Sequence, residues 1–186
     1  MGKFIVVEGL DGAGKTTLAT ALAACIPNSV HVREPGGTPT AEAIRSIVKD
    51  GALVGTETTA YGEILLMFAA RVYLGQQIQA WLDEGRTVIC ERWIHSTFVY
   101  QGIDEPTVDF IQVLIAALDL PTPDLALLMS VPERDVDARG EPDHFDIRSK
   151  GLNPEWTDPF WGDLAEHTAI IDRSVTAEDL CQYYGL

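Results

Sequence analysis

Short apolar runs alternate along the chain with longer segments in which apolar residues recur at helical spacing. The first of these runs is rich in β-branched residues and ends in glycines, and the runs together predict buried strands at 3–8, 30–33, 87–90, 125–131 and 169–171. The longer segments predict helices over 15–25, 41–49, 59–84, 108–118 and 177–184. Strands that alternate with helices favour right-handed crossovers and a parallel sheet covered by helices on both faces. The pattern therefore predicts an α/β fold.

A single domain accounts for the whole chain, because 186 residues suffice for one α/β domain with its own core and leave little room for a second. Residues 132–159 depart from the pattern, since they are polar and rich in Pro and Asp, and they predict a short mobile lid. Ligands of parallel sheets bind beyond the carboxyl ends of the strands, where the motifs described below fall.

Composition excludes several classes of partner. A net charge of −15 argues against nucleic acid, which requires a basic surface. No segment approaches the run of about 20 apolar residues that spans a bilayer, and the start of the chain is too short and too polar for a signal peptide. The cysteines, Cys25, Cys90 and Cys181, lack the spacing of a metal site and are typical of reduced thiols. We expect a cytoplasmic protein without nucleic-acid or membrane partners.

The strongest motif follows the first strand and matches G-x-x-x-x-G-K-[ST] in full: Gly9-Leu10-Asp11-Gly12-Ala13-Gly14-Lys15-Thr16, then Thr17. Glycines let backbone N–H groups surround a β-phosphate, the lysine reaches the β- and γ-oxygens, and the hydroxyl of the last residue binds Mg²⁺. The helix that follows points its positive end at the same anion. The motif predicts ATP and Mg²⁺ as cofactors, bound by Gly9, Asp11, Gly12, Ala13, Gly14, Lys15, Thr16 and Thr17.

Further segments bear on the reaction: Arg33-Glu34-Pro35-Gly36-Gly37-Thr38, Met67-Phe68-Ala69-Ala70-Arg71, Glu91-Arg92-Trp93 and Ser96-Thr97-Phe98-Val99-Tyr100-Gln101-Gly102. Each has an ordinary explanation by itself, as a solvated charge, a core residue or a helix with a glycine stop. Together with the phosphate-binding loop, and in this order, they resemble the thymidylate kinase family. The resemblance is clear from Phe4 to about Gly102, weaker over 124–140 and thin beyond.

The resemblance implies a P-loop NTPase of the nucleoside monophosphate kinase type, with three layers, a parallel five-stranded sheet and a short lid. It implies transfer of the γ-phosphoryl group of ATP to dTMP by a protein that is usually a homodimer. Phosphoryl transfer requires aligned phosphates and cations rather than covalent chemistry, which suits the arginines of these segments.

Residue roles are implied in the same way. Asp11 resembles the carboxylate near the sugar 3′-hydroxyl, and Arg92 the clamp on the acceptor phosphate, with Arg33 as a second cation. Pro35 matches a proline of the monophosphate loop. The remaining substrate-binding residues are expected to be Phe68, Arg71, Ser96, Thr97 and Tyr100. Of these, Arg71 and Thr97 resemble the residues at the thymine edge, and Tyr100 the ring beside the 2′ carbon.

The chain departs from the family pattern at two positions near the site. Its strand-end acid is Glu91 rather than the usual Asp, and we expect Glu91 and Thr16 to bind Mg²⁺ directly or through water. The base-stacking aromatic residue of the family stands one turn before Arg71, where this chain has Met67, with Phe68 one position later.

A catalytic arginine is expected in the lid, because the loop position that carries one in some thymidylate kinases is Gly12 here. Arg139 matches the lid pattern best, and the other candidates are Arg134, Arg148 and Lys150. The alternative is that these lid cations only pair with neighbouring aspartates at the surface. The catalytic set is thus expected to be Lys15, Arg92 and Arg139.

Three other functions stay open at this point. One is a related deoxynucleoside monophosphate kinase of different or broader base specificity. A deoxynucleoside kinase is disfavoured by the 33–38 segment, since a free nucleoside brings no phosphate to clamp. A P-loop switch that binds ATP and signals through a partner would show no dependence on an acceptor.

Overall fold

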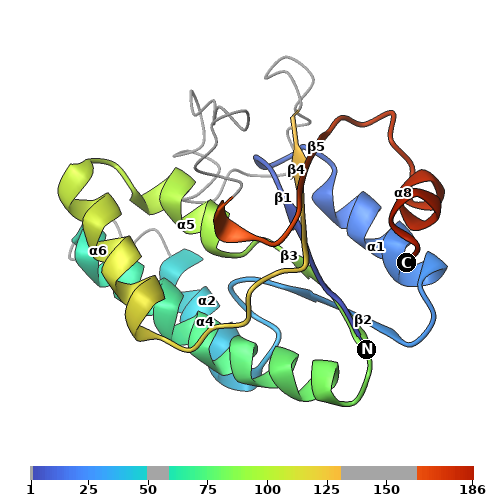
Figure 1. The fold of residues 1–186 in the computed structure, drawn as a ribbon. Coiled ribbons are helices and arrows are strands. Elements are labelled where there is room, and N and C mark those ends of the chain that lie inside the picture. Colours follow the sequence, from blue (N-terminus) through green and yellow to red (C-terminus); the bar gives the residue numbers. More distant parts are fainter. Residues whose placement is uncertain (1, 50–58, 131–162) are drawn as a thin grey trace.

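The computed structural model describes residues 2–49, 59–130 and 163–186. Its centre is a sheet of five strands in the order β2-β3-β1-β4-β5, and all pairings are parallel (Figure 1). The strands are β1 Phe4–Glu8, β2 Ser29–Arg33, β3 Thr87–Glu91, β4 Leu125–Met129 and β5 Thr168–Ile171. β1 and β4 are buried throughout, which is why their sequences are continuous apolar runs.

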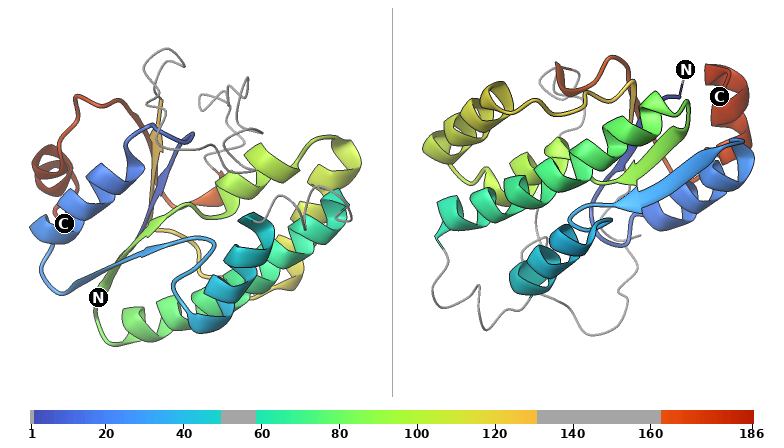
Figure 2. Two further views of the ribbon diagram at one scale, coloured as in Figure 1. Left: turned by 180° about the vertical axis from the view of Figure 1, so that it is seen from behind. Right: turned by 90° about the horizontal axis from the view of Figure 1, so that it is seen from below.

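Helices cover both faces of the sheet, so the molecule has three layers (Figure 2). One face is covered by α1 Lys15–Cys25 and α8 Ala177–Tyr184. The other carries α4 Ala60–Asp83, α5 Ile94–Gln101 and α6 Glu105–Ala117, and α2 Pro39–Lys49 packs against α4. Alternate residues of each central strand divide between two cores: Phe4 and Val6 belong to one, Ile5 and Val7 to the other.

The register brings the carboxyl ends of three strands together. Val7 pairs with Glu91, and Glu91 pairs with Arg33 on its other side. The loops that leave these strands carry the motifs at 9–16, 33–38 and 91–102, so segments distant in sequence meet at one edge of the sheet.

The predicted fold is confirmed, and the element bounds differ by a few residues. The largest differences concern α5, predicted only as a possible short helix, and the start of α6 at Glu105 instead of residue 108. Asp104 caps α6 because its carboxylate accepts from Thr107 N at 3.0 Å, and Pro106 suits the first turn. The strand predicted to reach residue 131 ends at Met129. The lid at 132–159 lies outside the described residues.

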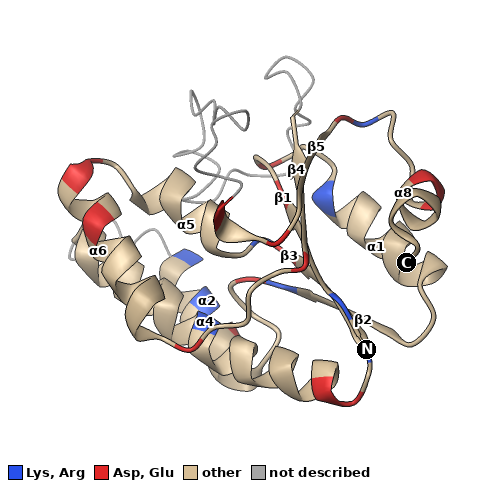
Figure 3. Cartoon of the chain, viewed as in Figure 1, with Lys and Arg blue, Asp and Glu red and all other residues tan. Residues whose placement is uncertain are grey.

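No helix in the described part of the chain is long and apolar enough to cross a membrane. Figure 3 shows basic positions on α2 and at the start of α1, whereas acidic positions mark α6 and α8.

Candidate active site

The phosphate-binding loop joins β1 to α1 and depends on glycine backbone conformations. Gly9, Gly12 and Gly14 have φ angles of 149°, 77° and 100°, a region that other L-residues rarely adopt. A Cβ at Gly9 would also meet Met129 Cβ at 3.0 Å. The loop therefore exposes backbone N–H groups at the amino end of α1, the arrangement that binds a phosphate.

Lys15 is the first residue of α1 and lies folded over the loop. Its Nζ donates to Leu10 O at 2.7 Å and is 3.9 Å from Asp11 Oδ1. Burial, reinforced by the positive charge of Arg92, lowers the pKa of Lys15 to about 7. A phosphate at the loop would supply the negative charge that this buried amine lacks.

Thr16 and Glu91, the two residues expected to bind Mg²⁺, are hydrogen-bonded to each other. Thr16 Oγ1 donates to Glu91 Oε2 at 2.6 Å, and His31 Nε2 lies 2.8 Å from Glu91 Oε1. Burial opposes ionisation of Glu91, but the hydrogen bonds from His31 and Thr16 hold its pKa below the usual value. A hydroxyl and an ionised carboxylate fit Mg²⁺, which takes few protein oxygens beside phosphate and water. No cluster of three or more His, Cys, Asp or Glu that could hold a metal occurs among the described residues.

Arg92 is the centre of a polar cluster between the loop and α5. Its φ of 68° places a non-glycine residue in the left-handed region. Its guanidinium donates to Gly9 O at 3.2 Å, Ser96 Oγ at 3.0 Å and Tyr100 Oη at 3.2 Å, and pairs with Asp11. Although burial alone would raise it, Arg92 and Lys15 lower the pKa of Asp11. The cluster brings three predicted acceptor-site residues, Asp11, Ser96 and Tyr100, into contact with Arg92.

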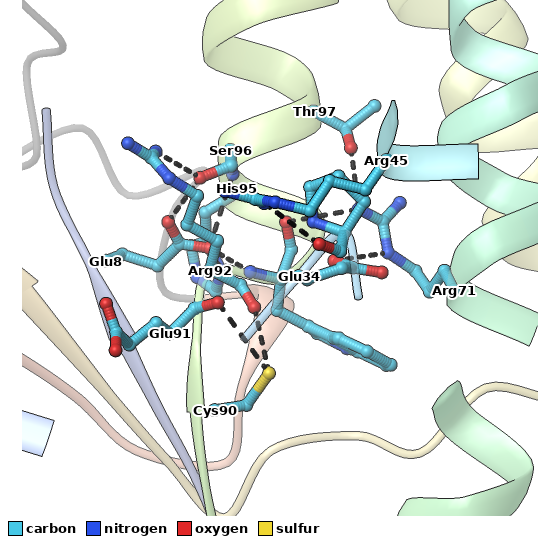
Figure 4. A network of polar contacts seen from close by, with 12 residues as sticks. Glu8, Glu34, Arg45, Arg71, Cys90, Glu91, Arg92, His95, Ser96 and Thr97 are labelled. Atoms are coloured by element: carbon cyan, nitrogen blue, oxygen red, sulfur yellow. Dashed lines mark hydrogen bonds and ion pairs between the residues drawn. The ribbon is translucent and has the colours of Figure 1, made fainter. Parts of the chain in front are cut away.

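Glu8, the last residue of β1, supports this cluster through hydrogen bonds to the start of α5. Its fully buried carboxylate accepts from Trp93 N at 2.6 Å, Ser96 N at 3.3 Å and Ser96 Oγ at 2.7 Å (Figure 4). The end of β1 thereby holds the start of α5, which directly follows Arg92.

Arg71 is fully buried and fixed by several partners. Its guanidinium donates to Glu34 Oε2 at 2.8 and 3.0 Å, to Thr97 Oγ1 at 2.7 Å and to Trp93 O at 3.3 Å. Burial raises the pKa of Glu34 to about 7, against the effect of Arg71. The Nη1 of Arg71 has no hydrogen-bond partner among the described residues. One strong donor is therefore left for a ligand.

A cavity opens beside these groups. Five residues of its wall were expected to bind substrate or cofactor: Asp11, Pro35, Arg92, Ser96 and Tyr100. Five others were not: Glu34, Arg45, Lys49, Met67 and Gln101. Arg45 and Lys49 stand four residues apart on α2, so both reach the same side of that helix, a spacing visible in the sequence. Gln101 belongs to the 96–102 segment, but the family resemblance implied no role for this residue.

Four of the predicted substrate-binding residues do not line this cavity. Arg71 and Thr97 lie behind it, joined to its wall through Glu34. Phe68 is 2% exposed and lies under the Arg71 guanidinium, 4.8 Å from ring centre to Cζ, so Met67 occupies the wall position instead. Arg33 is half exposed and pairs with Glu42 at 3.5 Å. The four lid cations, Arg134, Arg139, Arg148 and Lys150, lie outside the described residues.

Comparisons with known proteins agree with the motifs. The thymidylate kinase family model matches residues 7–146. A thymidylate kinase from Baumannia cicadellinicola subsp. Homalodisca coagulata is 37% identical over 188 residues, covering 95% of this chain and 84% of its own. One from Chromohalobacter salexigens is 40% identical over 165 residues, covering 81% and 76%.

Solved structures of thymidylate kinases share the fold. The enzyme from Ehrlichia chaffeensis superposes with a TM-score of 0.70 and 25% identity, covering 99% of this chain and 98% of the other. The one from Candida albicans gives 0.74 at 24% identity, covering 99% and 89%, and supports the fold alone.

Proposed function

This chain belongs to the thymidylate kinase family, and on that premise we propose that it transfers the γ-phosphoryl group of ATP to dTMP, giving dTDP and ADP. The observation that carries the choice of acceptor is a pair of buried polar atoms without partners near the cavity. These are an acceptor in the cavity wall, Gln101 Oε1, and a donor, Arg71 Nη1, that lies behind the wall at Glu34; neither has a hydrogen-bond partner among the described residues.

Thymine offers the complementary pair, because its O4 accepts a hydrogen bond and its N3–H donates one. Cytosine presents the opposite pair, an N4 donor and an N3 acceptor. Gln101 is held in orientation by its Nε2, which donates to Glu63 Oε1 at 2.6 Å, so its oxygen is the atom left for the base. A base that leaves these buried groups unpaired loses about 1–3 kcal/mol for each.

The acceptor phosphate would lie among the cations of the cavity wall. Arg92 comes from the end of β3, and Arg45 and Lys49 come from α2. Arg45 Nη1 donates to Pro35 O at 2.9 Å, which ties α2 to the monophosphate loop. On the donor side, Lys15 would hold the β- and γ-phosphates of ATP, and Thr16 and Glu91 would hold Mg²⁺, which neutralises charge on the transferred group.

The lid is proposed to supply a further cation to the transition state through Arg139. Gly12 provides no side chain at the loop position, and an added arginine in phosphoryl transfer is worth about 10³–10⁵ in rate. Comparing kcat of Arg139→Ala with kcat of Arg134→Ala and Arg148→Ala at saturating substrates assigns the role. A drop of less than tenfold for Arg139→Ala beside a collapse of another variant would move the role to that residue.

A homodimer in the cytoplasm is the proposed assembly and location. Tyr61, Leu65 and Tyr73 recur at helical spacing on α4 and are each 43–50% exposed, an apolar stripe typical of an interface. Phe110 on α6 extends it through a ring contact with Tyr61 at 5.2 Å. The three cysteines are free thiols, as suits a reducing compartment.

A coupled ADP-release assay over nucleosides and monophosphates tests the proposed reaction. We expect turnover with dTMP, less with dUMP and little with dCMP or free thymidine. Met67 in the cavity wall favours a second candidate, a deoxynucleoside monophosphate kinase of broader base specificity, and comparable turnover of dTMP and dCMP would select it. ATP hydrolysis that is independent of any acceptor would refute both.

A further inference from the structure

Arg173 reaches the phosphate-binding loop from the far end of the chain. It lies between β5 and α8, and none of the sequence motifs includes it. Its Nη2 donates to Gly12 O at 2.5 Å and its Nε donates to Ala13 O at 3.3 Å. One guanidinium therefore holds two successive carbonyl groups of the loop.

The turn that carries Arg173 is itself fixed. Asp172 Oδ1 accepts from Ser174 N at 2.7 Å and from Ser174 Oγ at 2.6 Å, which closes the turn directly after β5. The preceding residue, Ile171, pairs with Met129 on β4, and Thr176 caps α8 two residues beyond the turn. Arg173 is thus presented to the loop from the sheet edge and not from a free tail.

The two hydrogen bonds determine where the loop N–H groups point. In a trans peptide the C=O and N–H directions are opposed, so carbonyls of Gly12 and Ala13 turned to Arg173 direct the N–H groups of Ala13 and Gly14 away from it. In this structure Ala13 N accordingly bonds within the loop, to Leu10 O at 3.2 Å. A phosphate at the loop would engage the Gly14 N–H, and it would compete with Leu10 O for the Ala13 N–H.

The loop requires such support because its own residues supply little. Gly12 and Gly14 have positive φ angles. Glycine adopts positive and negative φ angles about equally easily, so the peptide planes beside these two residues can rotate. A charged donor bound to two neighbouring carbonyls restricts both planes at once.

We infer that Arg173 is a positioning residue for the donor nucleotide, which acts by fixing the phosphate-binding loop so that its N–H groups face the phosphates of ATP. The inference rests on the proposed binding of ATP at this loop. It predicts a defect in binding of nucleoside triphosphate or diphosphate, with no defect in binding of the acceptor monophosphate, because the two hydrogen bonds that carry the inference go to Gly12 O and Ala13 O, in loop residues that do not line the cavity.

The test is calorimetry of ATP and of dTMP, each with Mg²⁺, on the wild-type chain and on Arg173→Ala, Arg173→Lys and Arg86→Ala. Arg86 is a matched control, an arginine whose recorded ion pair is with Glu84 at 4.0 Å and not with the loop. We expect the Kd of ATP to rise about tenfold in Arg173→Ala, with the Kd of dTMP within twofold of wild type. Arg86→Ala should leave both values unchanged.

Arg173→Lys separates positioning from simple charge, because lysine keeps the charge and loses the fork that spans two carbonyls. Positioning predicts that Arg173→Lys binds ATP nearly as weakly as Arg173→Ala, and that amide exchange at Gly12–Gly14 is faster in both. Recovery of wild-type affinity by lysine would overturn the inference, as would an ATP Kd within twofold of wild type in Arg173→Ala or an equal loss for dTMP. A wild-type chain that binds no ATP would instead refute the proposed function and this inference with it.

Discussion

Replacing Glu8 should damage the acceptor site without touching a substrate. Glu8 lies at the end of β1 with no exposed surface, and its carboxylate holds the turn from Trp93 to Ser96. The turn follows Arg92, whose φ of 68° costs about 1–3 kcal/mol and persists only while the surroundings enforce it. We predict that Glu8→Ala lowers the stability of the protein and frees Arg92 from its observed position. Glu8→Gln should retain most of the stability and most of the ordering of Arg92.

The magnitude follows from the donors left behind. Glu8→Ala removes the acceptor of two backbone N–H groups, Trp93 N and Ser96 N, in a place that water does not reach. Each unsatisfied buried donor costs about 1–3 kcal/mol, so the free energy of unfolding should fall by about 2–6 kcal/mol. Ser96 Oγ adds little to this sum, because its hydroxyl can rotate and already accepts from Arg92. The amide oxygen of Glu8→Gln can still accept both N–H groups, and its loss should stay near 1 kcal/mol.

Urea unfolding followed by circular dichroism gives the free energies, and steady-state kinetics give the KM for dTMP. Glu84→Ala, at an exposed carboxylate 4.0 Å from Arg86, is the control and should change stability by less than about 0.5 kcal/mol. We expect the KM for dTMP to rise at least tenfold in Glu8→Ala at temperatures where the variant is folded, with the KM for ATP changed less. A stability loss below 1 kcal/mol in Glu8→Ala, or equal losses in the alanine and glutamine variants, would refute the supporting role of this carboxylate.

Three further predictions concern the cluster and one helix cap. Arg92→Ala should remove about 2–4 kcal/mol of transition-state stabilisation, seen in kcat/KM for dTMP, and an equal loss of ATP affinity by calorimetry would contradict its place on the acceptor side. If the Tyr100 ring crowds the 2′ position, wild type and Tyr100→Phe should prefer dTMP over its ribonucleotide about tenfold or more in kcat/KM, and Tyr100→Ala should lose the preference. Hydrogen bonds from Thr107 lower the pKa of Asp104. The cap therefore stabilises the folded protein fully at pH values above the ordinary pKa of an aspartate, and this contribution is lost as the pH falls through the lowered pKa. The Tm difference between wild type and Asp104→Ala should therefore be largest near neutral pH and vanish in acid, and a constant difference would exclude the cap as its cause.

Local patterns predicted the fold well, and also the place of the glycine-rich loop between β1 and α1, because both depend on neighbours in sequence. The loop needs glycines at fixed offsets before a lysine and a hydroxyl, and α1 was predicted from Lys15 to Cys25 as observed. The limits of α6 were predicted less well, since Asp104 and Thr107 begin the helix three residues before its apolar pattern does.

The wall of the cavity shows that a sequence pattern does not determine which side chains of a helix face a ligand. Successive residues of an α-helix point about 100° apart, so a shift of one position separates a ligand-facing side chain from a core side chain. Met67 faces the cavity and Phe68 packs under Arg71, although the aromatic residue is the better base-stacking candidate by residue type. Gln101 and Arg173 could not be assigned from the sequence at all, because their roles depend on contacts with Glu63 and Gly12, 38 and 161 residues away.

The acidity of the chain and its proposed anionic substrates are compatible because of where the cations lie. With a net charge of −15 the whole molecule repels nucleotides at long range, but exposed charges are screened beyond about 8 Å at physiological ionic strength. Within that distance of the phosphate-binding loop and the cavity, Lys15, Arg92 and Arg173 are fixed by named partners, and α2 adds two more cations. Surface acidic residues, those of α6 and α8 among them, can slow the approach of a nucleotide, but in the proposed function the affinity is determined by cations that act at contact distance, where screening is weak.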